Sequence, residues 1–344
     1  MKSVKKLSTI ISSVLACLFF LQVNAQDLQA DNMLLAQRPG GGWSKHFKGK
    51  SLNYNVEFSE DKKAEIIAEA KSDDANIDNG STVKEIRYLV TAFKKTNNPK
   101  YLAAAENGIR YLLKAQYKNG GWPQYYPDKS SYRAHVTFND NAMINALKLL
   151  QDVVLKQSDF EVVNSQLIEP SANAVSKGID CILKTQIKVN GKLTAWCQQY
   201  DEKTLQPANA RAYELVSISG SESANIIEFL MAQPNPGKEI KAAINAAVEW
   251  YKTVKIVGYK VVEMPAPGTE KGTDKQLVAD SSSTIWARYY EIYTNKPFFC
   301  DRDGIVKYSM KEIGYERRNG YAWYGAWANQ LLDKHYPKWV KKNS

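Results

Sequence analysis

Two short runs of aspartate, asparagine, serine and threonine are the residues of this sequence best suited to chemistry. They are Asp78-Asn79-Gly80-Ser81-Thr82 and Thr137-Phe138-Asn139-Asp140-Asn141, and each stands directly before a segment with helical periodicity. Such side chains often cap helices, because their oxygens accept hydrogen bonds from the first backbone amides. The same oxygens are the ligands that Ca²⁺ prefers. The two runs therefore predict either helix caps or a shared calcium site.

Arginines form a second group with chemical potential. Arg211 stands in the polar segment Lys203–Ser223, Arg288 is expected on a helix around Trp286–Tyr290, and Arg302 follows fourteen residues later. Guanidinium groups bind carboxylates through two parallel hydrogen bonds, so several of them suit a chain of uronic acids. The alternative for each arginine is an ordinary structural salt bridge.

The sequence gives little support for a phosphate-binding, zinc or nucleophilic-triad site. No glycine-rich phosphate loop follows a strand, no Cys-x-x-Cys is present, and the three histidines are widely spaced. A zinc site of the usual kind and a local nucleophilic triad are therefore not indicated. Beyond residue 25, no run approaches the roughly 20 apolar residues that span a bilayer, so the mature chain is not expected in a membrane.

Residues 1–25 read as a signal peptide. A lysine-containing start precedes the apolar run Leu7–Leu21, and Val23-Asn24-Ala25 fits the small-x-small cleavage pattern. We therefore expect a secreted or periplasmic protein with one catalytic domain, residues 26–344. The whole chain carries 46 basic and 36 acidic residues, a net charge of +10. This charge serves either solubility alone or attraction to a polyanion, and for an exported protein an acidic polysaccharide is favoured over nucleic acid as that polyanion.

The body of the chain is predicted to be mainly helical. Apolar residues recur at spacings of three and four from Val83, Leu102 and Met143 onward, and similar patterns cover about 172–187, 222–233, 238–254, 281–293 and 322–334. The clearest strand signal is Val257–Met264, which is followed by a run of prolines and glycine.

A weak internal repeat suggests how these helices are arranged. An apolar helix end, then a glutamine, a glycine turn and a tryptophan recur at Gln37–Trp43, Gln116–Trp122 and Gln186–Trp196. Stacked helical hairpins bury their apolar faces on one another. We therefore expect an α/α toroid whose long loops form a cleft at one end. Trp122 is either a platform for a sugar ring in that cleft or a packing residue.

Several longer strings resemble the pectate lyases of polysaccharide lyase family 10. The resemblance spans about residues 30–335 and rests on Asn119-Gly120-Gly121-Trp122-Pro123-Gln124, Phe138-Asn139-Asp140-Asn141-Ala142-Met143, Thr194-Ala195-Trp196-Cys197-Gln198-Gln199, Arg211-Ala212-Tyr213-Glu214, Ser219-Gly220-Ser221-Glu222-Ser223 and Tyr315-Glu316-Arg317-Arg318 with Gly320-Tyr321-Ala322-Trp323-Tyr324. Val216 departs from the family, which more often has proline there, but the change removes no functional group.

The resemblance implies an (α/α)₃ toroid and a calcium-dependent β-elimination on polygalacturonate. Carried over by position, Arg211 is the base and Asp140 the main calcium ligand, with Asp78 at the same ion. Arg288 and Arg302 match arginines that hold substrate carboxylates. Because a free guanidinium has a pKa above about 12, Arg211 needs nearby cations, a dry site or alkaline pH to act as a base.

Two other functions fit part of the same pattern. A glycoside hydrolase acting on uronic-acid-containing glycans would use Asp78 and Asp140 as acid and base, about 6.5–9.5 Å apart, without calcium. A non-catalytic pectin-binding protein would use the arginines and aromatic residues only to hold the polymer.

Overall fold

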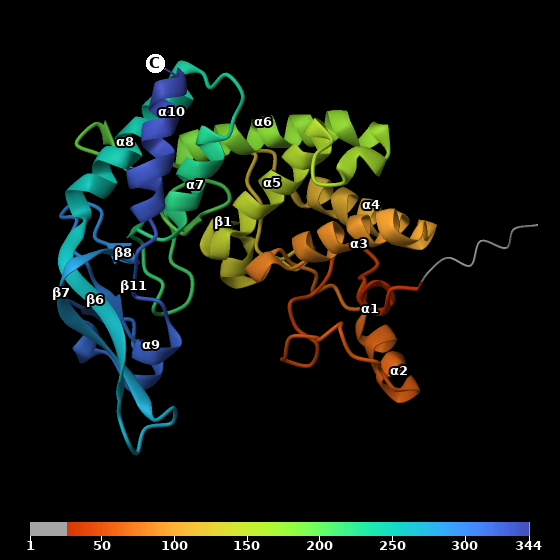
Figure 1. Cartoon of the computed structure of the whole chain (residues 1–344), viewed down its shortest axis with the longest axis horizontal. Helices are drawn as coiled ribbons and strands as arrows, with labels where there is room; N and C mark the ends of the chain where they lie inside the picture. The colour runs from red at the N-terminus through yellow and green to blue at the C-terminus, as the bar shows by residue number, and fades with distance from the viewer. Residues whose placement is uncertain (1–25, 344) are drawn as a thin grey trace, which may run out of the picture.

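The computed structural model describes residues 26–343, so the predicted signal peptide lies outside the described residues. Three helical hairpins occupy the middle of the chain (Figure 1). Their helices are α3 (Val83–Thr96) with α4 (Pro99–Ala115), α5 (Ala142–Leu155) with α6 (Ile168–Thr185), and α7 (Glu222–Met231) with α8 (Lys238–Val254). Among the described residues, no helix is both long and apolar enough to cross a bilayer.

Local sequence explains how the first hairpin turns. α3 ends at Asn97, whose left-handed backbone (φ 56°) is a common helix stop. Asn98 then caps α4 by accepting a hydrogen bond from the Lys100 amide at 3.1 Å, and Pro99 occupies the first helical position, which needs no amide donor. The helices over 172–187, 222–233 and 238–254 predicted from periodicity are also present.

The internal repeat corresponds to a repeated hydrogen-bonded framework. Each repeat glutamine donates to a carbonyl in its own loop and to a carbonyl in a later helix, and each repeat tryptophan donates to the helix before it. The glutamine pairs are Gln37 with Gly41 and Ala104, Gln116 with Gly120 and Ala174, and Gln186 with Thr194 and Ala243. The indoles of Trp43, Trp122 and Trp196 donate to Met33, Leu112 and Ile182.

The structure contains a fourth copy of the tryptophan loop that the sequence repeat did not predict. Trp286 donates to the Tyr251 carbonyl at 3.0 Å, as the other three tryptophans do to theirs. Four residues after Trp286, the Tyr290 hydroxyl accepts from the Ala287 amide, just as the Tyr200 hydroxyl accepts from the Cys197 amide. This copy lacks the preceding glutamine and glycine turn, which is why the pattern missed it.

Glycine is required where one loop passes over a helix. Gly120 has a φ of +92°, and a side chain there would place its Cβ 1.9 Å from the Lys177 carbonyl oxygen. Any other residue would therefore be both strained and in collision with a backbone atom. The same close approach occurs at Gly41, against the Asn107 carbonyl.

The C-terminal part is rich in β-structure. β6 (Ile256–Pro265) and β7 (Thr273–Ala287) form a long antiparallel hairpin that extends away from the helices, and β11 (Tyr324–Gly325) pairs with the end of β7 (Figure 1). The strand predicted at Val257–Met264 is thus confirmed. The helix predicted over 281–293 is wrong, since β7 and β8 (Tyr289–Tyr290) occupy it. Arg288 therefore lies between two strands.

The remaining elements are short. The other helices are α1 (Leu28–Ala36), α2 (Glu60–Glu69), α9 (Tyr315–Gly320) and α10 (Tyr336–Asn343), the last of which follows a helical turn at Leu331–His335. Two-residue strand pairs join the loops: β1 (Val136–Thr137) with β4 (Gln199–Tyr200), β5 (Ile218–Ser219) with β8, β2 (Lys188–Val189) with β3 (Lys192–Leu193), and β9 (Phe299–Cys300) with β10 (Val306–Lys307).

The expected mainly α toroid is wrong. Within residues 26–343, the first helical hairpin packs on the second and the second on the third, without comparable packing of the first on the third. The hairpins therefore stand in an open row (Figure 1). The long β6–β7 hairpin forms a three-stranded sheet with β11, so the fold is a mixed α and β one. A second small apolar cluster, which includes Tyr213, Tyr289 and Trp323, supports the loops near the C-terminus.

Candidate functional site

The two predicted polar runs form short turns that lie against each other. Turn η1 (Asp78–Gly80) precedes α3 and turn η3 (Asn139–Asn141) precedes α5, and the two turns are in contact. Each has two residues with positive φ: Asn79 (47°) and Gly80 (76°) in η1, and Asp140 (49°) and Asn141 (60°) in η3. Asparagine and aspartate adopt this conformation more readily than other residues with side chains. The residue types thus suit two tight turns that enter helices side by side.

The two turns line a small polar cavity together with three later loops. The cavity contains Asp78, Asp140 and Arg211, three residues singled out from the sequence. Its other lining residues are Lys45, Asn79, Gln124, Tyr125, Tyr132, Asn139, Gln199 and Glu214. Residues separated by more than 130 positions in the chain therefore bring three carboxylates, an amine and a guanidinium into one space.

Asp78 has one paired and one free carboxylate oxygen. Its Oδ2 accepts a hydrogen bond from Lys45 Nζ at 2.7 Å, while its buried Oδ1 has no partner among the described residues. Asn79, with its amide oriented as its neighbours require, donates to Asp140 Oδ2 at 3.2 Å. Buried oxygens without donors are costly, and a hard cation would satisfy them. The donor set of carboxylates and amides fits calcium.

Asp140 lies between a cation and other acids. Burial raises the pKa of its carboxyl, the positive charge of Arg288 lowers it, and the negative charges of Glu222 and Asp78 raise it, so that its pKa lies above the usual value. Arg288 Nη2 is 3.5 Å from Asp140 Oδ1 and 2.6 Å from Glu222 Oε1. Arg288 is itself buried, so it holds Asp140 and Glu222 in place from within the protein.

Arg211 is held by a carboxylate that the sequence analysis did not identify. Its Nε donates to Glu214 Oε2 at 2.7 Å and its Nη2 donates to the other oxygen. Burial lowers the pKa of Arg211, but the hydrogen bonds and charge of Glu214 outweigh burial and raise it. The cationic surroundings that would favour a neutral guanidinium are therefore not what Arg211 has here.

Three expected substrate-binding residues, Arg288, Arg302 and Trp122, are not among those that line the cavity. Trp122 is fully buried and donates to the Leu112 carbonyl, so the prediction that it stacks on a sugar is wrong. Its neighbour Tyr125 lines the cavity instead. Arg302 is exposed and pairs with Glu316 at 3.1 Å. Its guanidinium lies 5.8 Å from the ring of Tyr213, which also lies 4.9 Å from that of Arg211.

One sequence position recurs around the site. The residue two places after each framework tryptophan is Lys45, Gln124, Gln198 or Arg288. Lys45 and Gln124 line the cavity, Gln198 donates to Asn139 at 3.1 Å, and Arg288 pairs with Asp140. The tryptophan repeat was visible in the sequence, and this offset is the signal that could have identified Lys45.

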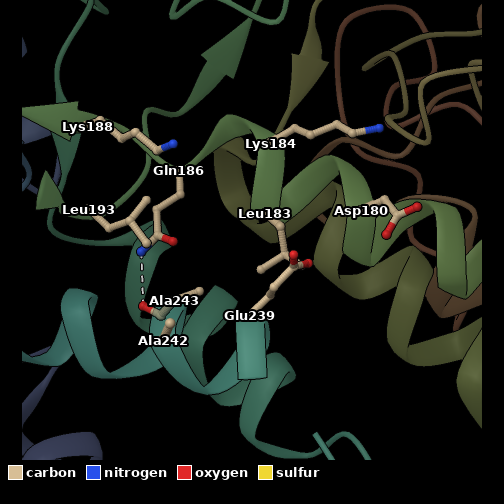
Figure 2. A pocket seen from close by; sticks show the side chains of 9 residues that line it. All are labelled: Asp180, Leu183, Lys184, Gln186, Lys188, Leu193, Glu239, Ala242 and Ala243. Atoms are coloured by element: carbon tan, nitrogen blue, oxygen red, sulfur yellow. Dashed lines mark hydrogen bonds between the residues drawn. The ribbon is translucent and has the colours of Figure 1, made fainter. Parts of the chain in front are cut away.

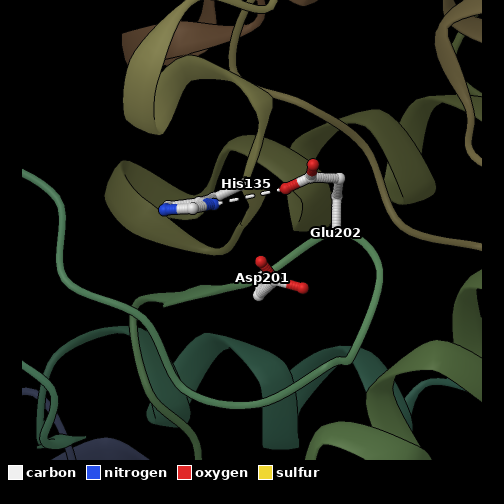
Figure 3. A group of neighbouring side chains, drawn as sticks. All are labelled: His135, Asp201 and Glu202. Atoms are coloured by element: carbon white, nitrogen blue, oxygen red, sulfur yellow. Dashed lines mark ion pairs between the residues drawn. The ribbon is translucent and has the colours of Figure 1, made fainter.

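Two other features share no lining residue with this cavity. Figure 2 shows a groove between α6, α8 and the β2–β3 hairpin, lined by residues such as Lys184 and Glu239, where Gln186 makes its framework bond to Ala243. Figure 3 shows His135, Asp201 and Glu202, whose ligand atoms lie within 4.8 Å of one another. This cluster is a second possible acidic metal site beside the strand pair β1–β4.

Comparisons with known proteins point to one family. The sequence model of the pectic acid lyase family matches residues 37–332. A family 10 polysaccharide lyase from Cellvibrio cellulosa has 34% identity over 92% of this chain and 93% of its own, with a TM-score of 0.78. An aspartate-to-alanine mutant of a family 10 lyase from the same organism, in complex with trigalacturonic acid, has 35% identity over 90% and 92%, with a TM-score of 0.79. No curated protein matches.

Proposed function

This chain belongs to the pectic acid lyase family and is a pectate lyase, and from that premise we propose that its polar cavity cleaves de-esterified polygalacturonate by calcium-dependent β-elimination. The observation that carries the proposal is that Asp78, Asp140 and Arg211 line one cavity. Two carboxylates and a guanidinium in one small space are suited to an anionic substrate only when a cation offsets the carboxylates.

Asp78 and Asp140 are the residues proposed to hold Ca²⁺. The unpartnered Oδ1 of Asp78 and the acidic surroundings of Asp140 favour a divalent ion. When bound, the ion would withdraw charge from a substrate carboxylate and make the adjacent C5 hydrogen more acidic. Lys45, which pairs with Asp78 at 2.7 Å, would then be free to turn toward the polymer.

Arg211 is proposed as the base. It accepts the C5 proton, the electrons of the C5–H bond form the C4–C5 double bond, and the bond from C4 to the glycosidic oxygen breaks. The leaving oxygen takes a proton from solvent, and the new non-reducing end is a 4,5-unsaturated uronate. Since Glu214 holds Arg211 in its charged form, this step requires that the hold of Glu214 be weakened or the pH be high.

Arg288 and Arg302 are proposed to bind substrate carboxylates, but from different positions. The buried Nε of Arg288 has no acceptor among the described residues and can still donate one hydrogen bond. Arg302 is exposed near Tyr213, where it can receive a uronate beyond the cavity if it leaves Glu316.

Ultraviolet absorbance of the conjugated product tests the proposal. Purified residues 26–344 are incubated with polygalacturonate at alkaline pH, with CaCl₂, with a chelator, and with Arg211→Ala. We expect absorbance to rise only with calcium and to vanish in the variant. Reducing ends without absorbance would indicate a hydrolase, and binding without either product would indicate a pectin-binding protein.

The protein is proposed to act outside the cytoplasm, on the basis of the signal-peptide pattern in residues 1–25. N-terminal sequencing of the protein recovered from culture medium or periplasm tests this proposal. A mature chain that begins at Gln26 is expected, and one that still begins at Met1 would contradict it.

A further inference from the structure

A continuous chain of hydrogen bonds runs from the partner of Arg211 through the protein interior. The Tyr321 hydroxyl contacts Glu214 Oε1 at 3.1 Å, the hydroxyls of Tyr321 and Tyr289 are 2.6 Å apart, and Tyr289 contacts Gln198 Oε1 at 2.6 Å. Tyr289, Gln198 and Glu214 are all buried. We call Glu214, Tyr321, Tyr289 and Gln198 the tyrosine relay. It continues through Asn139 to Asp140.

The relay has more contacts than hydrogens. Gln198 Oε1 and the carboxylate of Glu214 can only accept, and each of the two phenols between them carries a single hydrogen. Two hydrogens cannot fill three oxygen–oxygen contacts of 2.6 to 3.1 Å. Turning the amide of Gln198 would only move the deficit along the relay, because its Oε1 would then face the Asn139 oxygen that now accepts from its Nε2. A third hydrogen satisfies every contact, and Glu214 is the carboxyl in the relay that can carry it.

We propose that Tyr321, supported by Tyr289, is a positioning residue that shares a proton with Glu214 and thereby loosens the hold of Glu214 on the guanidinium proton of Arg211. The inference rests on the proposed function, in which Arg211 is the base. A carboxyl group that shares a proton with a phenol at 3.1 Å has less negative charge available for the guanidinium. The relay thus supplies a way for a paired arginine to lose its proton.

Other charged groups lie around Arg211 and Glu214 and also influence the protonation of the Arg211 guanidinium. Arg211 and Arg317 lie over the ring of Tyr213, at 4.9 and 4.3 Å, and Arg288 lies 4.6 Å from the ring of Tyr321. Arg317 and Arg288 are therefore the cations nearest these rings, but the hydrogen bonds and charge of Glu214 still keep the pKa of Arg211 above its usual value. The acids and the amine that share the cavity with Arg211 and Glu214 are Asp78, Asp140 and Lys45.

Two substitutions of opposite effect test the relay. Tyr321→Phe removes the shared proton and leaves Glu214 fully charged. The part of the pH profile in which kcat rises with pH, the alkaline limb, is therefore expected to move to higher pH by about one unit. At a fixed pH on that limb, this shift corresponds to about tenfold slower turnover. Glu214→Gln removes the charge, so the limb is expected to move to lower pH. KM is expected to change less than kcat in Tyr321→Phe. Tyr289→Phe is expected to shift the limb in the same direction as Tyr321→Phe, by less.

Tyr324→Phe is the matched control. Tyr324 packs beside Phe299, its ring 5.2 Å from that ring, and its hydroxyl makes no hydrogen bond to another described residue. We expect it to keep the wild-type pH profile. Thermal unfolding of each variant establishes that it is folded. If Tyr321→Phe does not fold, Tyr289→Phe replaces it as the test of the relay.

The outcomes separate this inference from the proposed function. Opposite shifts in Tyr321→Phe and Glu214→Gln support the relay. Loss of rate without movement of the limb in both variants, or a Tyr321→Phe profile equal to that of Tyr324→Phe, would overturn it while the wild-type enzyme still forms unsaturated product. A wild-type enzyme that forms none would overturn the proposed function, and the role of Tyr321 with it.

Discussion

At the scale of single residues, Asp140 is the side chain on which the metal hypothesis depends most. It lies 3.5 Å from Arg288 and near two other acids, Glu222 and Asp78. Replacing it with asparagine keeps an oxygen ligand but removes a charge, so calcium affinity is expected to fall at least about tenfold, because ligand charge sets affinity in such sites. Calorimetric titration with CaCl₂ measures the change, and excess calcium is expected to restore part of the activity.

Asp201→Asn is the informative comparison for that experiment. Asp201 belongs to the cluster with His135 and Glu202, away from the cavity. Unchanged calcium affinity in Asp201→Asn, together with loss in Asp140→Asn, would assign the functional ion to the cavity. The reverse result would move it to the cluster.

The sequence identified some of these residues and missed others for a physical reason. Asp78 and Asp140 stood out because oxygen-rich runs before helices are recognisable, and Arg211 because its string resembles a family motif. Glu214 lies in that same string, but its contact with Arg211 depends on how the loop folds back over three residues. Trp122 was misjudged because a buried indole and a sugar platform have the same local sequence.

At the scale of elements, Glu85 makes α3 sensitive to pH. Its side chain is buried, and burial raises its pKa from 4.5 to about 7, more than Lys84 lowers it. The folded state therefore retains this proton better than the unfolded chain. The stability that follows is present below pH 4.5 and is lost as pH rises to about 7, by roughly 3 kcal/mol at 1.36 kcal/mol per pKa unit.

Glu85→Gln is accordingly expected to narrow the difference in stability between pH 4 and pH 8.5. Urea unfolding at both values measures it. Glu249→Gln is the control, since Glu249 is an exposed glutamate on α8. If the two variants respond to pH alike, burial of Glu85 is not the cause.

Helices were predicted better than strands because their signal is local. A spacing of three and four is enough to place α3 or α8. The segment 281–293 has apolar residues at helix-compatible spacings, but Ile285 and Thr284 pair with Ile256 and Val257 of β6. Pairing with a distant strand overrides local periodicity, and the partner could not be assigned from that window alone.

At the scale of the whole molecule, the open row of hairpins could not be predicted from the repeat. The repeat predicts that each hairpin packs on the next, and the structure has this packing. Whether such an array closes depends on contacts between its first and last members, for which the sequence carries no periodic signal. The β6–β7 hairpin, which follows the last helical pair, is the element that the toroid expectation left out.

The chain without its predicted signal peptide has 43 basic and 36 acidic residues, and this net positive charge makes substrate capture sensitive to salt. The Debye length falls from about 10 Å at 0.1 M to about 3 Å at 1 M ionic strength, so KM for polygalacturonate is expected to rise severalfold over this range while kcat changes less. Initial rates at increasing NaCl measure both. Highly methyl-esterified pectin, which lacks most of the charge, is the comparison substrate and should be cleaved poorly at every salt concentration. An unchanged KM would exclude long-range attraction.

The position two residues after each framework tryptophan has a consequence for how the polar cavity can change during evolution. The indole and its carbonyl partner keep the loop in place, whichever side chain stands two positions later. Lysine, glutamine, glutamine and arginine at 45, 124, 198 and 288 thus occupy four positions whose side chains take no part in the indole–carbonyl bonds of the framework. A family built this way can acquire a different sugar preference by substitution at four positions, while the scaffold that carries them stays the same.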